Sequence, residues 1–276
     1  MKPIYITDLD HTFLRSDLTI SPYSQKVWNA KSREAILSVA TARSFKKSHE
    51  FLDKLHLAAP MILLDGSMVV SPEKELIDLK LVNKALGDAV IDEGARFDIY
   101  PFVIGLKDMD LNEAFLYPNR VNALQSQVLQ NYQNDDRLEL HKEIRAMEMN
   151  LKIVYFGEEK ELRPLTEHLQ KTFGHELEYK LSPEKYSDGY FLTILHPHGD
   201  KAHALQTIAG YLKRDLDDFT VFGDSINDLG MFEKAGTAVA VQNALDEVKE
   251  KADIILQHTN DEDAVAKYLE TLTLRK

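Results

Sequence analysis

Short apolar runs alternate with amphipathic stretches over the first part of the chain. Residues 3–7 form an apolar run that predicts a buried strand, and the polarity changes abruptly at Asp8. A Ser-Pro pair at the start of 21–31 is typical of a helix N-terminus. The elements predicted next are strands at 35–40 and 61–64, a helix at 45–55, and a hairpin of 68–70 and 76–79. The pattern indicates strand–helix alternation followed by a small hairpin.

The pattern changes between residues 83 and 186, where helix-like and strand-like stretches are mixed. Helices are predicted at 83–93, 119–132 and 158–173, and strands at 99–104, 148–156 and 177–181. We expect 83–186 to form a second α/β domain that is inserted into the first.

Strand–helix alternation resumes after residue 186. Strands are predicted at 191–195, 219–222 and 238–241, and helices at 200–212, 227–235, 244–252 and 261–272. Repeated units of this kind favour a parallel sheet covered by helices on both faces. The sequence therefore predicts an α/β fold, with a doubly wound, Rossmann-like core formed by 1–82 and 187–276. Ligands of such sheets bind at the carboxyl ends of the strands.

The composition limits the binding partners and the cellular compartment that we expect. A net charge of -12 argues against a nucleic-acid partner, because such proteins need clustered Lys and Arg to neutralise phosphates. The chain has no cysteine, which excludes disulfides, thiolate metal sites and a thiol nucleophile. Its apolar runs are too short to span a membrane, and no cleaved leader is expected. We expect a cytoplasmic protein that is a monomer or a homodimer.

Polar groups follow several of the strands predicted for the core. They are Asp8 and Asp10, then Thr41, then Lys201 at a helix start, then Asp224 and Asp228. If the strands are neighbours, these groups converge at one edge of the sheet. A phosphoryl group in transfer carries negative charge, so a carboxylate cluster there requires a cation. Oxygen ligands favour Mg²⁺, and a lysine and a hydroxyl can hold the remaining phosphate oxygens.

These residues resemble the four motifs of the haloacid dehalogenase superfamily, in the family's order. Asp8-Leu9-Asp10-His11-Thr12 is similar to the first motif, Thr41 in Ala40-Thr41-Ala42-Arg43 to the second, Lys201 to the third, and Gly223-Asp224-Ser225-Ile226-Asn227-Asp228 to the fourth. The inserted domain resembles the large α/β cap of the Cof-type, sugar-phosphatase-like branch.

The resemblance implies a role for each matching residue. Asp8 would attack phosphorus to form an aspartyl phosphate, and Asp10 would act as general acid and then as general base. The residues expected to contact phosphate are Leu9, Thr41, Lys201 and Asn227. Those expected to hold or orient Mg²⁺ are Asp8, the backbone carbonyl of Asp10, Asp224 and Asp228, the last of them also orienting Lys201. The implied substrate is a small phosphorylated metabolite, with specificity residing in the cap.

Four positions depart from the family's pattern. His11 and Ala42 stand where glycine is usual, Asp65 stands where Asn is common before a glycine, and Gln242 replaces a glycine. None of these changes removes a proposed catalytic group. His11 and Ala42 add side chains where backbone N–H groups are expected to approach phosphate.

The sequence leaves three functions open. The first is hydrolysis of small phosphomonoesters, and the second is a phosphosugar mutase that returns the phosphoryl group to another hydroxyl. The third is a non-hydrolytic switch or phosphometabolite-binding protein. A dinucleotide-binding oxidoreductase is disfavoured because no G-x-G-x-x-G follows the first strand. Several cations are candidate anion contacts, namely Arg43, Arg120, Arg137, Arg145 and Lys152.

Overall fold

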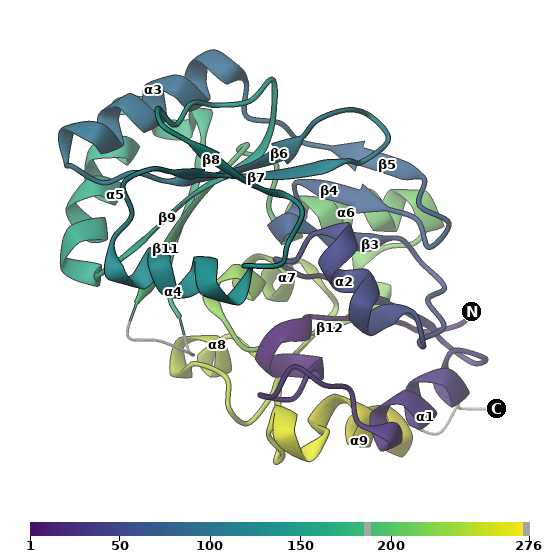
Figure 1. Ribbon diagram of the computed structural model, residues 1–276. Coiled ribbons are helices and arrows are strands. Elements are labelled where there is room, and N and C mark those ends of the chain that lie inside the picture. Colours follow the sequence, from purple (N-terminus) through teal and green to yellow (C-terminus); the bar gives the residue numbers. More distant parts are fainter. Residues whose placement is uncertain (185–188, 273–276) are drawn as a thin grey trace. The chain divides into compact units, whose positions relative to one another are not determined.

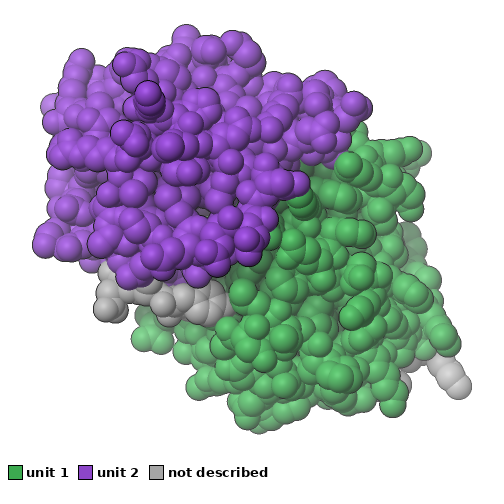
Figure 2. All heavy atoms as spheres, in the orientation of Figure 1, with its two compact units in different colours: residues 1–79, 200–276 green, residues 80–199 purple. Residues whose placement is uncertain are grey.

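The computed structural model describes residues 1–184 and 189–272. The chain divides into two compact units, Met1–Leu79 with Asp200–Lys276 and Lys80–Gly199, which Figure 2 colours separately. The boundary expected at 186/187 lies outside the described residues.

A parallel sheet of five strands runs through the described residues of the first unit. Its strand order is β14 (Ile254–Ile255), β13 (Thr237–Ala240), β12 (Phe219–Gly223), β1 (Ile4–Thr7) and β2 (Ile36–Val39). Each neighbouring pair runs parallel. Because β1 lies between β12 and β2, the segments that follow these three strands emerge side by side. The α/β fold class predicted from the sequence is confirmed.

The helices of the first unit lie within the ranges that the sequence predicts. They are α1 (Pro22–Lys31), α2 (Phe45–Leu52), α6 (Lys201–Leu212), α7 (Leu229–Lys234), α8 (Asp246–Glu250) and α9 (Ala264–Thr271). The Ser21 hydroxyl accepts the Ser24 N–H at 2.9 Å, and the Asp200 carboxylate accepts the His203 N–H at 2.9 Å. Helices α1 and α9 pack side by side (Figure 1). Within 1–184 and 189–272, no helix combines the length and apolar character needed to cross a bilayer.

A small antiparallel sheet adjoins the parallel one. It consists of β3 (Met61–Leu63), β4 (Met68–Val70) and β5 (Leu76–Leu79). The turn between β3 and β4 is tight: Asp65 has φ 63° and Gly66 has φ 115°. A Cβ on Gly66 would lie 2.2 Å from the Asp200 carbonyl, so this turn requires glycine. The Asp65–Gly66 turn therefore lies directly against the start of α6.

The second unit is built on a mainly antiparallel sheet. Its order is β10 (Glu178–Pro183), β11 (Tyr190–Leu195), β9 (Met149–Gly157), β6 (Phe102–Leu106), β7 (Glu113–Pro118) and β8 (Leu138–His141). The helices are α3 (Lys84–Arg96), α4 (Ala123–Asn131) and α5 (Glu159–Phe173). Apolar residues of α3 and α5 pack on one face of this sheet, and those of α4 pack with Phe102, Phe115 and Phe156 on the other.

The strand at 190–195 corrects the sequence analysis, which assigns it to the parallel sheet of the core. In the structure β11 pairs antiparallel with both β10 and β9, inside the second unit. A short apolar run predicts a strand but carries no information about which sheet it joins. Strands β7 and β8 are absent from the sequence-based prediction altogether.

Two helical glycines provide a test of the packing in the second unit. A Cβ on Gly94 of α3 would lie 2.3 Å from the hydroxyl of buried Tyr155, whereas one on Gly210 of α6 would meet nothing within 4 Å. We expect Gly94→Ala to lower the free energy of unfolding by about 1–3 kcal/mol, as overpacked cores do. The matched control Gly210→Ala should raise it by about 0.5–1 kcal/mol through helix propensity. Urea unfolding of both variants measures this, and equal effects would contradict the packing described.

Candidate active site

The loops after β1, β12 and β2 bring the predicted residues together at the carboxyl edge of the sheet. Thr7 is paired with Phe222 in the strand register, and the Asp8 N–H donates to the Phe222 carbonyl at 3.0 Å. Asp8 therefore lies next to the segment that carries Asp224. Thr41 follows β2, and its N–H donates to the Ile62 carbonyl at 2.9 Å. The sheet thus supplies Asp8, Thr41 and Asp224 from neighbouring strand ends.

Lys201 is the charged residue on which the predicted groups converge. It is the first residue of α6, and its side chain is fully buried. Its Nζ lies 2.7 Å from Oδ1 of Asp8 and 2.7 Å from Oδ1 of Asp228. Burial alone would lower the pKa of Lys201, but the negative charges of Asp228, Asp8 and Asp65 outweigh it and hold this pKa above its usual range. Lys201 is therefore a fixed positive charge.

Three buried carboxylates surround this ammonium group. Oxygens of Asp8, Asp224 and Asp228 lie within 4.8 Å of one another. Burial raises the pKa of Asp8 well above its usual range, the charges of Asp228, Asp224 and Asp10 raise it further, and Lys201 opposes them. One ammonium group does not balance this much buried negative charge. The chemistry of the donors, all carboxylate oxygens, fits a hard divalent cation such as Mg²⁺.

Asp228 and Thr12 hold the other members of the cluster in place. Oδ2 of Asp228 accepts the backbone N–H groups of Asp224 at 3.0 Å and Ser225 at 3.1 Å, while its Oδ1 accepts from Lys201. The Thr12 hydroxyl donates to Oδ1 of Asp224 at 2.9 Å. Asp228 thus links the loop after β12 to the start of α6, and Thr12 links that loop to the turn after β1.

Asp10 stands apart from the three-carboxylate group and has its own cationic partner. The Arg43 guanidinium donates to both Asp10 oxygens, from Nε at 2.8 Å and from Nη2 at 2.6 Å. The guanidinium also lies 4.7 Å above the ring centre of Phe51. Arg43 is a candidate anion contact by sequence, and its pairing with Asp10 is not predicted. Two residues 33 positions apart carry no local signal of such a contact.

Asn227 contacts a residue that the sequence analysis notes only as a departure from the family pattern. Its side-chain Nδ2 donates to Oδ1 of Asp65 at 3.0 Å. The Asp65 N–H in turn donates to the Thr41 carbonyl at 3.0 Å. Asp65 therefore connects two of the residues expected to contact phosphate.

The turn after β1 contains a backbone conformation that explains why glycine is usual at position 11. His11 has φ 57° and ψ 5°, in the left-handed region that favours glycine. The Asn243 side chain donates to the His11 carbonyl at 2.8 Å, and the Leu14 N–H donates to the Leu9 carbonyl at 2.7 Å. Leu9 itself is buried beneath this turn.

Other predicted anion contacts are engaged in ion pairs of the second unit. Arg120 pairs with Asp98, Arg145 with Asp92, and Arg137 with Glu113 and Asp135. Glu113 and Arg137 are buried, so this pair is part of the packing of β7 and β8.

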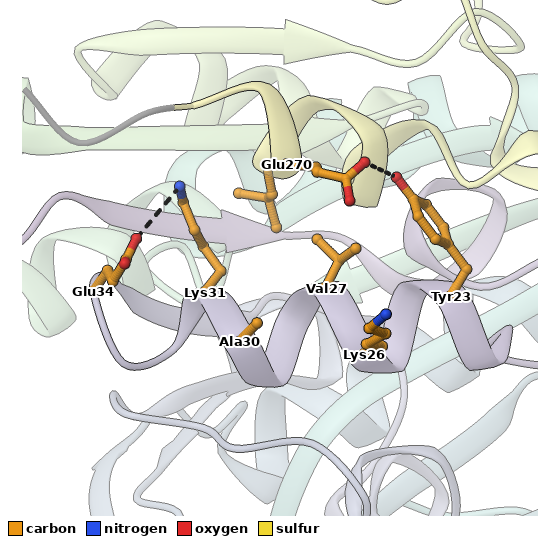
Figure 3. Close-up of a pocket in the computed structure, with 8 residues that line it drawn as sticks. Tyr23, Lys26, Val27, Ala30, Lys31, Glu34 and Glu270 are labelled. Carbon is orange, nitrogen blue, oxygen red and sulfur yellow. Dashed lines mark hydrogen bonds and ion pairs between the residues drawn. The ribbon is translucent and has the colours of Figure 1, made fainter.

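The first unit also contains a pocket. It has a volume of about 250 Å³ and is lined by α1 and α9 (Figure 3). The Tyr23 hydroxyl donates to Glu270 at 2.6 Å beside it. None of the described residues that line this pocket is a candidate site residue.

Comparison with known proteins assigns the chain to a family. A family model described as haloacid dehalogenase-like hydrolase matches residues 5–269. The chain is similar to the 5-amino-6-(5-phospho-D-ribitylamino)uracil phosphatase YwtE of Bacillus subtilis (strain 168), at 28% identity over 99% of this chain and 98% of that protein. A second phosphatase of that name from the same organism, YcsE, is 27% identical over 94% of this chain and 91% of that protein.

Solved structures share the fold. A haloacid dehalogenase-like hydrolase from B. subtilis has a TM-score of 0.79 at 22% identity, covering 99% of this chain and 100% of that one. Another from Bacteroides thetaiotaomicron has a TM-score of 0.78 at 19% identity, covering 98% and 99%. Both matches extend over the two units described above.

The Thr12 hydrogen bond leads to a prediction about cation affinity. Removing this partner in Thr12→Val should weaken Mg²⁺ binding about tenfold or more, as loss of a group that orients a metal ligand does. Titrating Mg²⁺ while following the melting temperature measures the affinity. Thr19→Val is the matched control, since the Thr19 hydroxyl bonds exposed Asp17 outside the cluster. An unchanged Mg²⁺ titration in Thr12→Val would show that Thr12 does not orient Asp224 for a cation.

The left-handed conformation of His11 leads to a second prediction. Both His11→Gly and His11→Ala remove the imidazole, but only glycine accepts φ 57° without strain. We expect His11→Gly to be about 1 kcal/mol more stable to urea than His11→Ala. If the alanine variant is as stable as the glycine variant, the turn does not impose this conformation in solution.

Proposed function

Because the chain belongs to the haloacid dehalogenase-like hydrolases, we propose that it is a phosphatase that cleaves small phosphomonoesters through an aspartyl phosphate on Asp8, with Mg²⁺ as its cofactor. The family membership and the assignment as an enzyme, both predicted from the motifs, are confirmed. The substrate class, the metal and the covalent intermediate are the proposal.

The observation that carries this proposal is the contact between Lys201 and Asp8 in a buried setting. The 2.7 Å contact fixes one oxygen of Asp8 and places a permanent positive charge beside it. A carboxylate held in this way presents its other oxygen in a defined direction, as nucleophilic catalysis requires. The same ammonium group is in reach of the negative charge that develops on a transferring phosphoryl group.

Asp8 and Asp224 are the side chains best placed to hold the cation. Both oxygens of Asp228 accept hydrogen bonds from protein groups, so we assign Asp228 to orienting Lys201 and the backbone at Asp224. The Asp10 backbone carbonyl remains the additional ligand that the family resemblance implies. When bound, the cation supplies positive charge that offsets repulsion between these carboxylates and the phosphate.

Two steps follow from the positions of Asp8 and Asp10. In the first, an Asp8 oxygen forms a bond to phosphorus, the bond to the ester oxygen breaks, and the Asp10 carboxyl gives that oxygen a proton. In the second, Asp10 takes a proton from a water molecule that attacks phosphorus, and the bond to Asp8 breaks. Thr41, Lys201, Asn227 and the backbone at Leu9 would hold the phosphoryl oxygens.

Arg43 has a positioning role in this scheme. Two nitrogens of its guanidinium group donate to the two Asp10 oxygens, which fixes the plane of that carboxyl group before substrate binds. Lysine cannot reproduce the bidentate geometry. Asp8 and Asp10 have separate cationic partners, Lys201 and Arg43, so each acid is held in its own position.

Substrate selection is assigned to the second unit, as the cap of the resembled branch implies. The names of the two B. subtilis phosphatases point to a phosphorylated, ring-bearing metabolite as a first substrate to test. Sugar phosphates remain in the same class of small phosphomonoesters.

A panel assay with Mg²⁺ tests the proposal. We expect phosphate release from 5-amino-6-(5-phospho-D-ribitylamino)uracil, a sugar phosphate, phosphoglycolate, pyridoxal phosphate or a flavin phosphate. In Asp8→Asn, kcat should fall at least 10³-fold, because the amide is not a nucleophile. A melting curve close to that of the wild type serves as the folding control. Full activity in Asp8→Asn, or no release from any ester, would contradict the proposal.

The same assay separates the two alternatives. Isomerisation of a hexose phosphate without free phosphate would indicate a mutase. A phospho-Asp8 that persists for hours would indicate a switch, whereas rapid turnover excludes it.

A further inference from the structure

Asp65 is a buried carboxylate beside the proposed phosphate-binding groups, and the proposed reaction does not use it. Only 5% of its surface is exposed. Its backbone is fixed on both sides: its N–H donates to the Thr41 carbonyl at 3.0 Å, and Gly66 lies against the Asp200 backbone with no room for a Cβ. The turn therefore restricts where the Asp65 carboxylate can lie.

Asp65 lies beside groups to which phosphate binding is assigned. Its Oδ1 accepts from Nδ2 of Asn227 at 3.0 Å, its backbone bonds that of Thr41, and its charge acts on Lys201. A negative charge in this position repels the anion that these groups would bind.

The Asp65 carboxylate also determines the orientation of the Asn227 amide. A carboxylate oxygen can only accept, so the NH₂ end of Asn227 must face Asp65. The planar amide then directs its carbonyl oxygen elsewhere. An asparagine at position 65 offers both a donor and an acceptor and would allow either orientation.

We propose that Asp65 is a positioning residue that sets the charge selectivity of the phosphate subsite, orienting Asn227 and weakening the binding of doubly charged oxyanions such as the inorganic phosphate product. This inference rests on the proposed function, because it takes Thr41, Asn227 and Lys201 to be the phosphate-binding groups. Its consequence is that product phosphate leaves more readily than it would from a site with a neutral residue at position 65.

Tungstate and perrhenate provide a direct test, since both are tetrahedral oxyanions but carry two charges and one charge respectively. We expect Asp65→Asn to bind tungstate about tenfold more tightly than the wild type, measured by calorimetry with saturating Mg²⁺. Perrhenate should gain only about threefold, because the Coulomb energy scales with the charge of the ligand. The inhibition constant of inorganic phosphate should fall by about the same factor as the dissociation constant of tungstate.

Two further variants make the result specific. Asp246→Asn removes one negative charge from a side chain that is 98% exposed, and it should leave both affinities unchanged. Asp65→Gly removes the charge and accepts φ 63° without strain, so it replaces Asp65→Asn if that variant does not fold. A purely structural role for Asp65 would lower the melting temperature without separating tungstate from perrhenate.

The outcomes distinguish this inference from the proposed function. Tungstate binding that is equal or weaker in the charge-neutral variants, or absent from all of the proteins, overturns the role of Asp65. A wild-type protein that hydrolyses no ester overturns the proposed function, while the tungstate comparison still decides whether Asp65 sets the charge of the subsite.

Discussion

The contacts of Lys201 with Asp8 and Asp228 are the interaction on which the first unit depends. The chain leaves this unit after Leu79 and re-enters it at Asp200, so the first side chain of α6 must find partners contributed by both halves. It does so at 2.7 Å from the turn after β1 and 2.7 Å from the loop after β12. A fully buried ammonium group without these carboxylates would be strongly unfavourable. The contact between Lys201 and Asp8 therefore joins the two halves of the unit at the site.

Charge balance explains how the acids are divided. Oxygens of Asp8, Asp224 and Asp228 lie within 4.8 Å of one another, and Lys201 contacts two of these acids. Asp10 is not part of that group and pairs with Arg43. Two carboxylates two residues apart in sequence thus lie in different electrostatic surroundings.

The sequence predicts which residues lie at the strand ends better than it predicts the side chains that they contact. The predicted order of parallel strands places Asp8, Thr41 and Asp224 at one edge of the sheet. That order follows from the local apolar pattern and from the rules that govern strand connections. The Arg43–Asp10 and Asp65–Asn227 contacts join residues far apart in the chain, and no local pattern encodes them. The same reason accounts for β11: its apolar run predicts a strand, but the choice of sheet depends on partners at 149–157 and 178–183.

Backbone strain at the site is held by tertiary contacts. His11, Leu64 and Asp65 all have positive φ although none is glycine, and all lie in turns that flank the carboxyl edge of the sheet. The turn at His11 is held by Asn243, whose side-chain oxygen in turn accepts the Asn260 N–H near the C-terminal helix. The turn at Asp65 is held by the Thr41 carbonyl and by the close approach of Gly66 to Asp200. Because distant segments supply these restraints, loosening α9 or the start of α6 would release the strained turns. The geometry of the site would then be lost before the sheet itself unfolds.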